Sequence, residues 1–547
     1  MNSWTQIYEP LGSVGVSTLV ALIPIIFYAA ALTVLNLKGH IAGTLTMLIA
    51  AAIAILVYGM PWTMTLAAAL QGFAFGLWPI AWIITGAVFL YRMTVKTGQF
   101  YIIRDSIVSI TSDQRLQLLL IGFSFGAFLE GAAGFGAPVA ITTALLAGLG
   151  FNPLYAAGLC LIANTAPVAF GGMGISVLVG GAVGGVDPFL VGAQSGRVLA
   201  PMILLVPFWL VFIMDGWRGV KETWPAVLVA ASSFTLGVVL TSNLIGFELP
   251  AILGSLSSLV SMTLFLKFWQ PKRIFRFDGQ QPAKDSHHHS PGKIFWAWLP
   301  FIILTLVMIL WNMPFFKALF AEGGALAWST IRFSMPYLDG LAVRTPPITP
   351  TPTPYPAIYS LNLIQGTGTA IMTAAILAMI LQRTGPKLGA TTFIEVALDL
   401  KKPVWTIGMV VALAYICNYS GLTSTLALAM AHTGPAATFF SPILGALGVF
   451  LTGSDTASNA LFCGLQAVTA QQVGVSDILL VAANNTGGTA GKMISPQSIA
   501  IAAAAAGLVG REGSLFRFTL KHSFLCMVVI GALTTIQAYL LPGTIPS

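Results

Sequence analysis

Long apolar segments separated by short polar ones run through the 547-residue chain from one end to the other. A helix rises about 1.5 Å per residue and the bilayer core is about 30 Å thick, so an apolar segment of about 20 residues can span the membrane. Such segments lie at 15–37, 41–59, 66–91, 197–214, 223–244, 249–268, 294–312, 363–383, 403–424 and 522–541. The pattern predicts an all-α polytopic membrane protein.

Two glycine-rich blocks, 116–190 and 436–510, interrupt this pattern. Four stretches within them mix Gly or Pro with polar residues: "EGAAGFGAPVA" (130–140), "ANTAPVAFGGMG" (163–174), "TGSDTASNA" (452–460) and "AANNTGGTAGKMISPQS" (482–498). Gly and Pro break helices, and backbone groups freed at membrane depth need partners in the protein or in a water-filled cavity. We therefore expect broken or re-entrant helices there, and about 12–14 membrane segments in total.

The composition supports the same class, because 56% of the residues are hydrophobic and only 8% are charged. A soluble domain carries about 25% charged residues, so most of this surface must face the lipid bilayer. The net charge of +8 does not indicate a nucleic-acid partner. The basic residues instead form short clusters between apolar segments, as is typical of the cytoplasmic loops of membrane proteins.

The positions of Lys and Arg also predict the orientation. Basic clusters lie near 38, 92–115, 218–221, 267–293, 383–402 and 511–521. If these face the cytoplasm, both termini lie on the opposite side of the membrane. Segment 313–362 falls on that side too, and its run "RTPPITPTPTPYP" is interpreted as an extended polyproline linker.

An internal repeat is suggested by two pairs of short motifs. "GAFLEG" (126–131) resembles "GVFLTG" (448–453), and "ANTAPVAFGGM" (163–173) resembles "ANNTGGTAGKM" (483–493). The charge pattern places the two halves in opposite orientations, which predicts an inverted-topology repeat. Residues 1–222 would form the first repeat, 223–268 a connecting helical hairpin, 269–293 a cytoplasmic linker and 294–547 the second repeat. Inverted repeats with interrupted helices are typical of secondary transporters. The alternative is that the glycines only allow helices to pack closely.

Three ionisable residues stand in the glycine-rich blocks: Glu130, Asp455 and Lys492. An ionisable side chain at membrane depth is costly, and it is a functional hypothesis by default. Burial favours the protonated form of a carboxyl group, so Glu130 or Asp455 could carry a coupling proton. Lys492 could neutralise a substrate carboxylate or pair with one of the acids. The alternative for all three is a structural role at helix ends.

Helix breaks also provide helix N-termini, whose partial positive charge suits a carboxylate. Neutral hydrogen-bonding side chains near the breaks complete the candidate substrate site, which comprises Asn164, Thr165, Ser454, Ser458, Asn459, Asn484, Asn485 and Ser495 together with Lys492. The sequence thus predicts an anion site built largely from dipoles.

Other chemistry finds little support in the sequence. His287, His288 and His289 lie in the polar stretch 278–293, where adjacent histidines are more often solvated than metal-binding. The chain contains no Walker A, HExxH or G-x-S-x-G motif, so neither ATP-driven transport nor an enzyme is indicated.

Several motifs resemble those of the bacterial lactate permease family. They are "WPIAWI" (78–83), "VKTGQF" (95–100), "GAFLEGAAGFGAPVAI" (126–141), "GLCLIANTAPVAFG" (158–171), "FLTGSDTASNALF" (450–462) and "GGTAGKMISPQSIAIA" (487–502). The resemblance runs almost from end to end and is weakest at 278–293 and 345–356. It implies an inner-membrane symporter that moves L-lactate, D-lactate and glycolate with protons, and that needs no cofactor besides the coupling proton.

Alternatives remain open at this point. Backbone carbonyls at broken helices also suit Na⁺, which would make the protein a sodium-coupled carboxylate transporter. A passive anion channel would need polar side chains along a continuous pore. The sequence leaves open which hydroxy acid is preferred, which acid carries the proton, what the oligomeric state is, and whether the repeats move as an elevator or rock.

Overall fold

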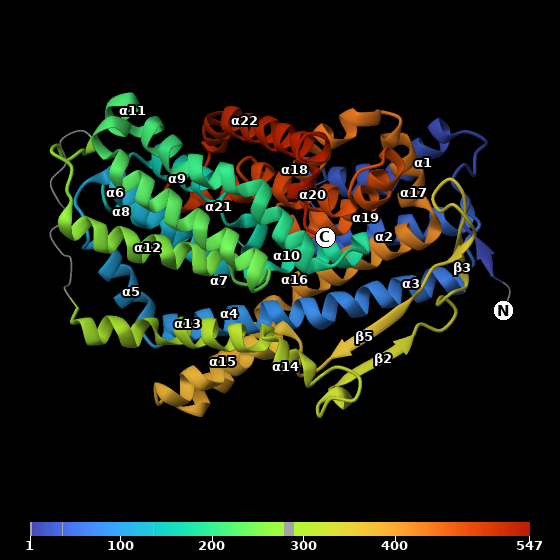
Figure 1. The fold of residues 1–547 in the computed structure, drawn as a ribbon, viewed down its shortest axis with the longest axis horizontal. Coiled ribbons are helices and arrows are strands. Elements are labelled where there is room, and N and C mark those ends of the chain that lie inside the picture. The colour runs from blue at the N-terminus through green and yellow to red at the C-terminus, as the bar shows by residue number, and fades with distance from the viewer. Residues whose placement is uncertain (1–2, 36, 135, 278–288) are drawn as a thin grey trace.

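The computed structural model describes residues 3–35, 37–134, 136–277 and 289–547. Within these ranges, ten helices are long and apolar enough to cross a membrane, or up to eleven if α9 (Pro153–Ala163) and the bent stretch after it form one span. The long helices run roughly along the longest axis of the molecule (Figure 1). The prediction of a polytopic helical membrane protein is confirmed.

Most of the expected spans appear as helices. Those with bounds close to the expected ones are α1 (Val14–Thr33), α2 (Gly39–Leu56), α12 (Pro250–Phe268), α13 (Pro291–Asn312) and α15 (Thr367–Leu381). The expected span 66–91 is divided into α3 (Trp62–Phe75) and α4 (Trp82–Lys96). Helices α16 (Pro386–Ser420) and α22 (Glu512–Tyr539) begin well before the expected 403 and 522. The helix count is lower than expected, partly because α11 (Pro188–Leu244) contains two expected spans on either side of a backbone break at Asp215 and Gly216. Shorter helices include α5 (Gln99–Val108), α14 (Pro314–Ala318) and α17 (Leu422–Ala431).

The glycine-rich blocks each fold into two helix–break–helix units. The first block contains α7 (Gly126–Ala132), α8 (Ala137–Gly148), α9 and α10 (Gly171–Gly184). The second block contains α18 (Ala437–Thr452), α19 (Asp455–Val473), α20 (Asp477–Lys492) and α21 (Pro496–Ala505). The blocks meet directly, since α10 packs against α19 and α8 packs against α21. The inverted relation between the halves and their domain bounds stay predictions.

The segment 313–362 contains strands, which the sequence analysis did not predict. Two short sheets form there, one of β1 (Trp4–Thr5), β3 (Ala342–Arg344) and β4 (Thr353–Pro354), the other of β2 (Thr330–Ser334) and β5 (Ile358–Asn362). The interpretation of the proline-rich run as a linker was therefore wrong in part, because Thr353 and Pro354 pair with Arg344 and Val343. Proline is tolerated there since β4 is an edge strand. These strands mark one end of the molecule (Figure 1).

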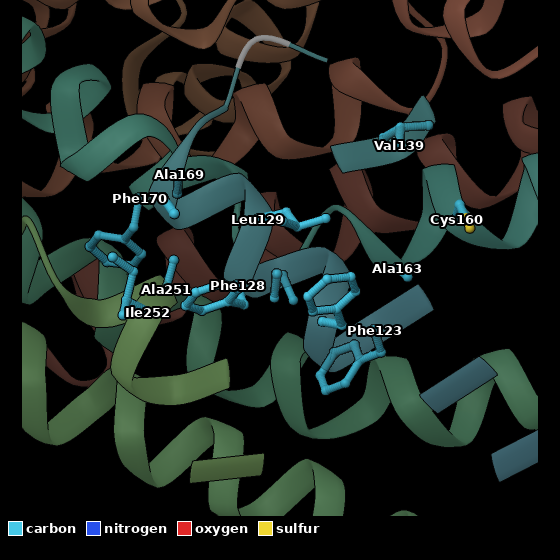
Figure 2. Close-up of a cluster of buried hydrophobic side chains, with 14 of the residues drawn as sticks. Phe123, Phe128, Leu129, Val139, Cys160, Ala163, Ala169, Phe170, Ala251 and Ile252 are labelled. Atoms are coloured by element: carbon cyan, nitrogen blue, oxygen red, sulfur yellow. The ribbon is translucent and has the colours of Figure 1, made fainter. Parts of the chain in front are cut away.

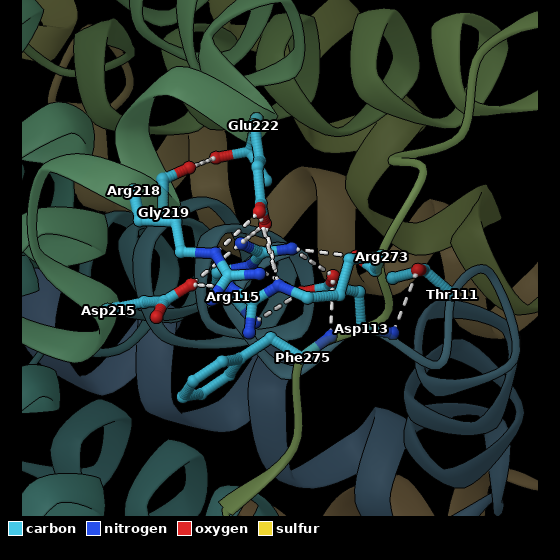
Figure 3. A network of polar contacts seen from close by, with 10 residues as sticks. Thr111, Asp113, Arg115, Asp215, Arg218, Gly219, Glu222, Arg273 and Phe275 are labelled. Atoms are coloured by element: carbon cyan, nitrogen blue, oxygen red, sulfur yellow. Dashed lines mark hydrogen bonds and ion pairs between the residues drawn. The ribbon is translucent and has the colours of Figure 1, made fainter.

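An ion-pair network holds the opposite end together, around α6 (Gln114–Gln117) (Figures 1 and 3). The fully buried guanidinium of Arg115 lies 2.7 Å from Asp113, 2.8 Å from Asp215 and 2.7 Å from Glu222. Arg273 also pairs with Asp215 and Glu222. The network ties α6 to the break in α11 and to the chain beyond α12, because each buried charge needs an opposite charge beside it.

The polar stretch after this network is described only in part. His287 and His288 lie outside the described residues, as do residues 278–286 of the expected linker. His289 Nε2 lies 3.4 Å from Asp105 Oδ2, and no group of three potential metal ligands occurs among the described residues.

Candidate functional site

A cavity of about 500 Å³ lies where the two glycine-rich blocks meet, against α1, α2 and α16. Its wall includes Glu130 near the end of α7, Asp455 at the start of α19 and Lys492 at the end of α20. These side chains are only 4%, 6% and 9% exposed. The cavity reaches outward to His40 in α2 and Lys402 in α16, which lie at the basic clusters that the charge pattern assigns to the cytoplasm. The structure thus brings the three ionisable residues of the sequence analysis into one wall.

An apolar cluster supports the short helix that carries Glu130 (Figure 2). Phe128 and Leu129 belong to this buried cluster together with Phe170 and Ile252. A β-carbon on Gly131 would lie 2.9 Å from Ile252 Cγ1, so α12 packs directly on α7. The close packing holds α7 in place and presents Glu130 to the cavity on its other side.

Four helices present their N-terminal ends to the cavity. Wall residues lie at the beginnings of α8 (Gly136), of the right-handed part of α10 after the left-handed residues 172–174 (Ile175 and Ser176), of α19 (Ser454, Asp455 and Thr456) and of α21 (Gln497 and Ser498). The first turn of a helix has unpaired N–H groups and a partial positive charge, which favour an anion. This feature of the expected anion site is present in the structure.

Lys492 sits at the opposite kind of helix end. Its Nζ donates a 2.7 Å hydrogen bond to the carbonyl of Gly453, the residue that ends α18 in a left-handed conformation. The ammonium group therefore compensates the negative end of α18 and also lines the cavity.

The two acids have carboxyl oxygens without partners. Glu130 Oε2 and both carboxyl oxygens of Asp455 make no hydrogen bond to any described residue. Lys492 is the main positive charge acting on each acid, but it forms no ion pair with either within the described chain. A buried oxygen without a partner costs about 1–3 kcal/mol. Native structures keep such groups where a proton, an ion or water takes the free position.

Glycines leave room for both carboxyl groups. A β-carbon on Gly171 would lie 2.7 Å from Glu130 Oε1, and a β-carbon on Gly488 would collide with Asp455 Oδ1. Any larger residue at these positions would displace the acids. Backbone packing therefore decides where the two charges lie.

The neutral side chains on the wall differ from those expected. Of the eight predicted, the cavity lining includes only Ser454, whose hydroxyl accepts from the amide of Ala457 and caps α19. Side chains that the sequence pattern did not single out as site residues also line it: Ser176, Thr452, Gln497 and Ser498. Thr456, a neutral donor in the stretch 452–460, lines the cavity as well. Most of these lie in or beside the first turn of a helix after a break, and that position is the signal that could have identified them.

Asn459, Asn484 and Asn485 do not line this cavity, contrary to expectation. Asn484 Nδ2 donates to Asn459 Oδ1 at 2.9 Å, and Asn459 Nδ2 donates to Asn485 Oδ1 at 2.8 Å. Asn485 Nδ2 also donates to Ser195 Oγ at 3.0 Å. The amides satisfy one another in a fully buried network between α19, α20 and α11, and so they are not free for a ligand.

The remaining predicted side chains also do not line the cavity, and most of them donate hydrogen bonds within the protein. Thr165 Oγ1 donates to the carbonyl of Ile162, and Ser458 Oγ donates to the carbonyl of Gly445. Ser495 caps α21 and donates to Ser498 Oγ at 2.8 Å. Asn164 lies beside Glu130 at the end of α9 but does not line the cavity.

The break in the stretch 482–498 lies after Lys492, and the helix is unbroken at Asn484 and Asn485. Helix α20 continues through Asn484 and Gly488 to Lys492, and the chain breaks only at 493–495. β-Carbons on Gly487 and Gly491 would collide with the carbonyls of Pro442 and Ala446 in α18. Here glycine allows two helices to approach closely, which is the alternative that the sequence left open. All four stretches thus contain a helix break, at 133–136, 164–174, 453–454 and 493–495.

Among solved structures, the chain is similar to the YdaH transporter of Alcanivorax borkumensis and to MtrF of Neisseria gonorrhoeae. Each comparison covers at least 95% of both chains at 12% identity, with TM-scores of 0.41 and 0.44. These scores are too low to carry an argument about the fold.

Sequence relatives are much closer. The chain is 58% identical to "L-lactate permease" of Salmonella typhimurium and 56% identical to "Glycolate permease GlcA" of Escherichia coli, with full coverage of both chains in each case. It is 48% identical to "L-lactate permease" of Bacillus subtilis over 99% of this chain and the whole of that one. The family model described as L-lactate permease matches residues 17–541. The chain therefore belongs to the L-lactate permease family.

Proposed function

We propose that this protein is a secondary transporter that carries L-lactate, D-lactate and glycolate across the bacterial inner membrane together with a proton. Membership of a permease family supports transport of a small solute, and the names of the relatives point to lactate and glycolate. The observation that carries the proposal is the buried cavity in which two acids with unpartnered oxygens face Lys492 and four helix N-termini.

The substrate carboxylate would lie between Lys492 and the N-termini of α19 and α21. The amide dipoles and the ammonium group would replace the water that the anion loses on entering the protein. The 2-hydroxyl group would hydrogen-bond to Ser176, Ser454 or Ser498, which are the serines of the cavity wall. A site built for a hydroxyl group should reject propionate, because its polar groups would stay unpaired.

Proton coupling would follow from the charges on the wall. With both acids ionised, an incoming carboxylate meets two negative charges and one positive charge. Protonation of either acid removes one repulsion, so proton and anion strengthen each other's binding. Glu130 and Asp455 act on the same cavity, and the proton is best assigned to the pair.

The test is accumulation of labelled L-lactate in proteoliposomes under an imposed pH gradient, in buffers without sodium. We expect uphill accumulation that collapses with a protonophore. Accumulation that requires a sodium gradient would favour the sodium-coupled alternative. Equilibration without accumulation would favour a passive channel.

We also propose that both termini are periplasmic. Strand β1 near the N-terminus pairs with β3, and Ile545 near the C-terminus packs against Leu479 at the start of α20. Just before α20, Gln472 donates to the carbonyl of Pro347, in the same segment as β3. Alkaline phosphatase fused to either terminus should therefore be active in cells. An inactive fusion at both ends would reverse the orientation.

A further inference from the structure

A second cavity, of about 580 Å³, lies toward the strand-bearing end of the molecule. Strand β5 forms part of its wall, as do the turn between α11 and α12 and helix α14. Helix α16 passes both cavities, with Ile407 on the wall of the first and Tyr415, about two turns later, on the wall of the second. We call the first the inner cavity and the second the outer cavity.

Glu248 contributes an acid to the outer cavity. It lies between α11 and α12 and is 6% exposed. Its Oε1 accepts a 3.4 Å hydrogen bond from Thr367, whereas Oε2 has no partner among the described residues. A β-carbon on Gly246 would lie 2.5 Å from Oε2, so the carboxyl group fits only because that residue is glycine. The packing around Gly246 thus fixes the position of the unpartnered Oε2 in the cavity wall.

Lys317 contributes a cation to the same cavity. It lies on α14, is exposed, and its ammonium group makes no hydrogen bond or ion pair within the described chain. It is the positive charge that acts on Glu248, yet the two groups are not in ion-pair contact. An unpaired cation and an unpaired acceptor therefore face one cavity with space between them.

Several other polar groups of this wall already have partners. Asp187 accepts from the amide of Phe189, Tyr359 donates to the carbonyl of Trp78, and Asn312 donates to the carbonyl of Met308. Among the charged side chains of the wall, Lys317 and Glu248 keep unpaired groups. The neutral amide oxygen of Gln71 also has no partner among the described residues, and the side chain of Asn312 lies beside Glu248.

We propose that the outer cavity is a second binding site for a short 2-hydroxy monocarboxylate, with the ligand carboxylate on Lys317 and its hydroxyl donating to Glu248. The choice of a 2-hydroxy monocarboxylate as ligand rests on the proposed function. The contacts assigned to its two functional groups rest on the positions of Lys317 and Glu248 in the cavity wall. Such a ligand carries an anionic acceptor and a donor a few ångströms apart, which complements the two unsatisfied groups. Burial raises the pKa of the Glu248 carboxyl, which lessens its repulsion of an anion. A binding site in the outer cavity would raise the local concentration of substrate before the substrate reaches the inner cavity.

Protection from chemical labelling tests this site. Ser360 is exposed and lines the outer cavity, so Ser360→Cys should react with a membrane-impermeant maleimide in right-side-out vesicles. Thr351→Cys is the matched control, because Thr351 is exposed in the same segment but is not part of the wall. Of the four native cysteines, three are buried and Cys417 is half-buried, which keeps the background low.

We expect L-lactate to slow labelling of Ser360→Cys and to leave Thr351→Cys unchanged. Propionate, which lacks the hydroxyl group, should protect only at higher concentration. Adding Lys317→Met should raise the half-protecting lactate concentration about tenfold or more, since a charge-assisted hydrogen bond is lost. Adding Lys492→Met, which alters the inner cavity, should leave the protection in place.

Four results would overturn the proposal. They are failure of Ser360→Cys to react while Thr351→Cys reacts, no protection by lactate, protection unaffected by Lys317→Met, and protection abolished by Lys492→Met. Equal protection by propionate would remove Glu248 from the site. Lactate accumulation measured in the same preparation keeps the two proposals apart, because protection without accumulation would contradict only the proposed function.

Discussion

At the scale of single residues, the inner cavity depends on three charged side chains whose nearest supports are backbone atoms. Lys492 bonds to a helix-ending carbonyl, and Glu130 and Asp455 lie against glycines. Because backbone positions are rigid compared with side chains, this arrangement holds charges at a defined separation without ion-pair contact. In the proposed mechanism, such separation would leave both acids and the cation free to bind a proton and an anion.

Glu130→Gln should abolish accumulation of lactate driven by a pH gradient, because glutamine keeps the shape of the side chain but cannot take up a proton. The protein should insert normally and still exchange labelled for unlabelled lactate. Asp455→Asn is the parallel variant. If both variants accumulate lactate as the unmodified protein does, the acids are structural and the proton lies elsewhere.

Lys492→Met should weaken lactate binding by about ten- to hundredfold, the usual worth of a hydrogen bond to a charged group. Binding titration of the purified protein measures this, and thermal unfolding should change much less. Lys521→Met serves as control, because Lys521 is exposed and lies outside the lining of both cavities. Unchanged affinity in Lys492→Met would remove this residue from the site.

Gly171→Ala should impair transport although alanine favours a helix. Its β-carbon would lie 2.7 Å from Glu130 Oε1 and would displace the carboxyl group. Gly148→Ala in α8 is the matched control, since a β-carbon there meets nothing within 4 Å. Initial rates of uptake at equal expression measure the difference. Equal rates in the two variants would show that the position of Glu130 tolerates displacement.

At the scale of elements, the molecule uses glycine in two ways. In α7–α8 and α18–α19 the chain leaves the helix at left-handed glycines, Gly134, Gly136 and Gly453 among them. In α20 the glycines keep helical conformation and let α18 approach to backbone contact. The first use exposes helix N-termini to the cavity, and the second fixes the helix that carries Lys492.

Arg115 joins α6 to α11 at the end of the molecule opposite the strands. Arg115→Met should lower the free energy of unfolding by about 3–5 kcal/mol, as expected when a buried ion-pair network loses its central charge. Asp113, Asp215 and Glu222 would be left beside fewer cations. Arg218→Met is the control, because its pair with Glu222 is exposed and should contribute about 0–1 kcal/mol. Thermal unfolding of the purified variants in detergent compares the two. Similar losses for both would contradict the central role of Arg115.

At the scale of the whole molecule, helix α16 lines two cavities. The inner one reaches His40 and Lys402, and the outer one reaches strand β5. In the proposed orientation, the inner cavity would open to the cytoplasm and the outer cavity to the periplasm. A carrier that alternates between two faces needs such an arrangement, with one cavity joined to the central charges at a time.

Thiol labelling from each side checks this geometry. Thr406 lines the inner cavity, so Thr406→Cys should react with an impermeant maleimide in inside-out vesicles and be slow in right-side-out ones. Ser360→Cys should show the reverse. Both residues reacting from the same side would contradict the assignment of inner and outer cavities.

The sequence alone determined the class of the protein, most of its spans and its three central charges. Long apolar segments have a local signature, and a lone Glu130, Asp455 or Lys492 within them is conspicuous because an isolated charge at membrane depth costs so much. The resemblance of the motifs also pointed to the lactate permease family, which the family model and the full-length relatives confirm.

Only the tertiary structure decided which neutral groups face the cavity and which glycines break a helix. A glycine that ends α18 and a glycine that packs α20 look alike in sequence, because the difference lies in the backbone that approaches from another helix. Asn484 and Asn485 likewise resemble ligand donors until Asn459 is seen to satisfy them. The strands near Ala342 depended on pairing with the distant Trp4. In each case the outcome depends on which residue contacts which. Contacts between residues far apart in the chain are determined by tertiary packing rather than by local sequence.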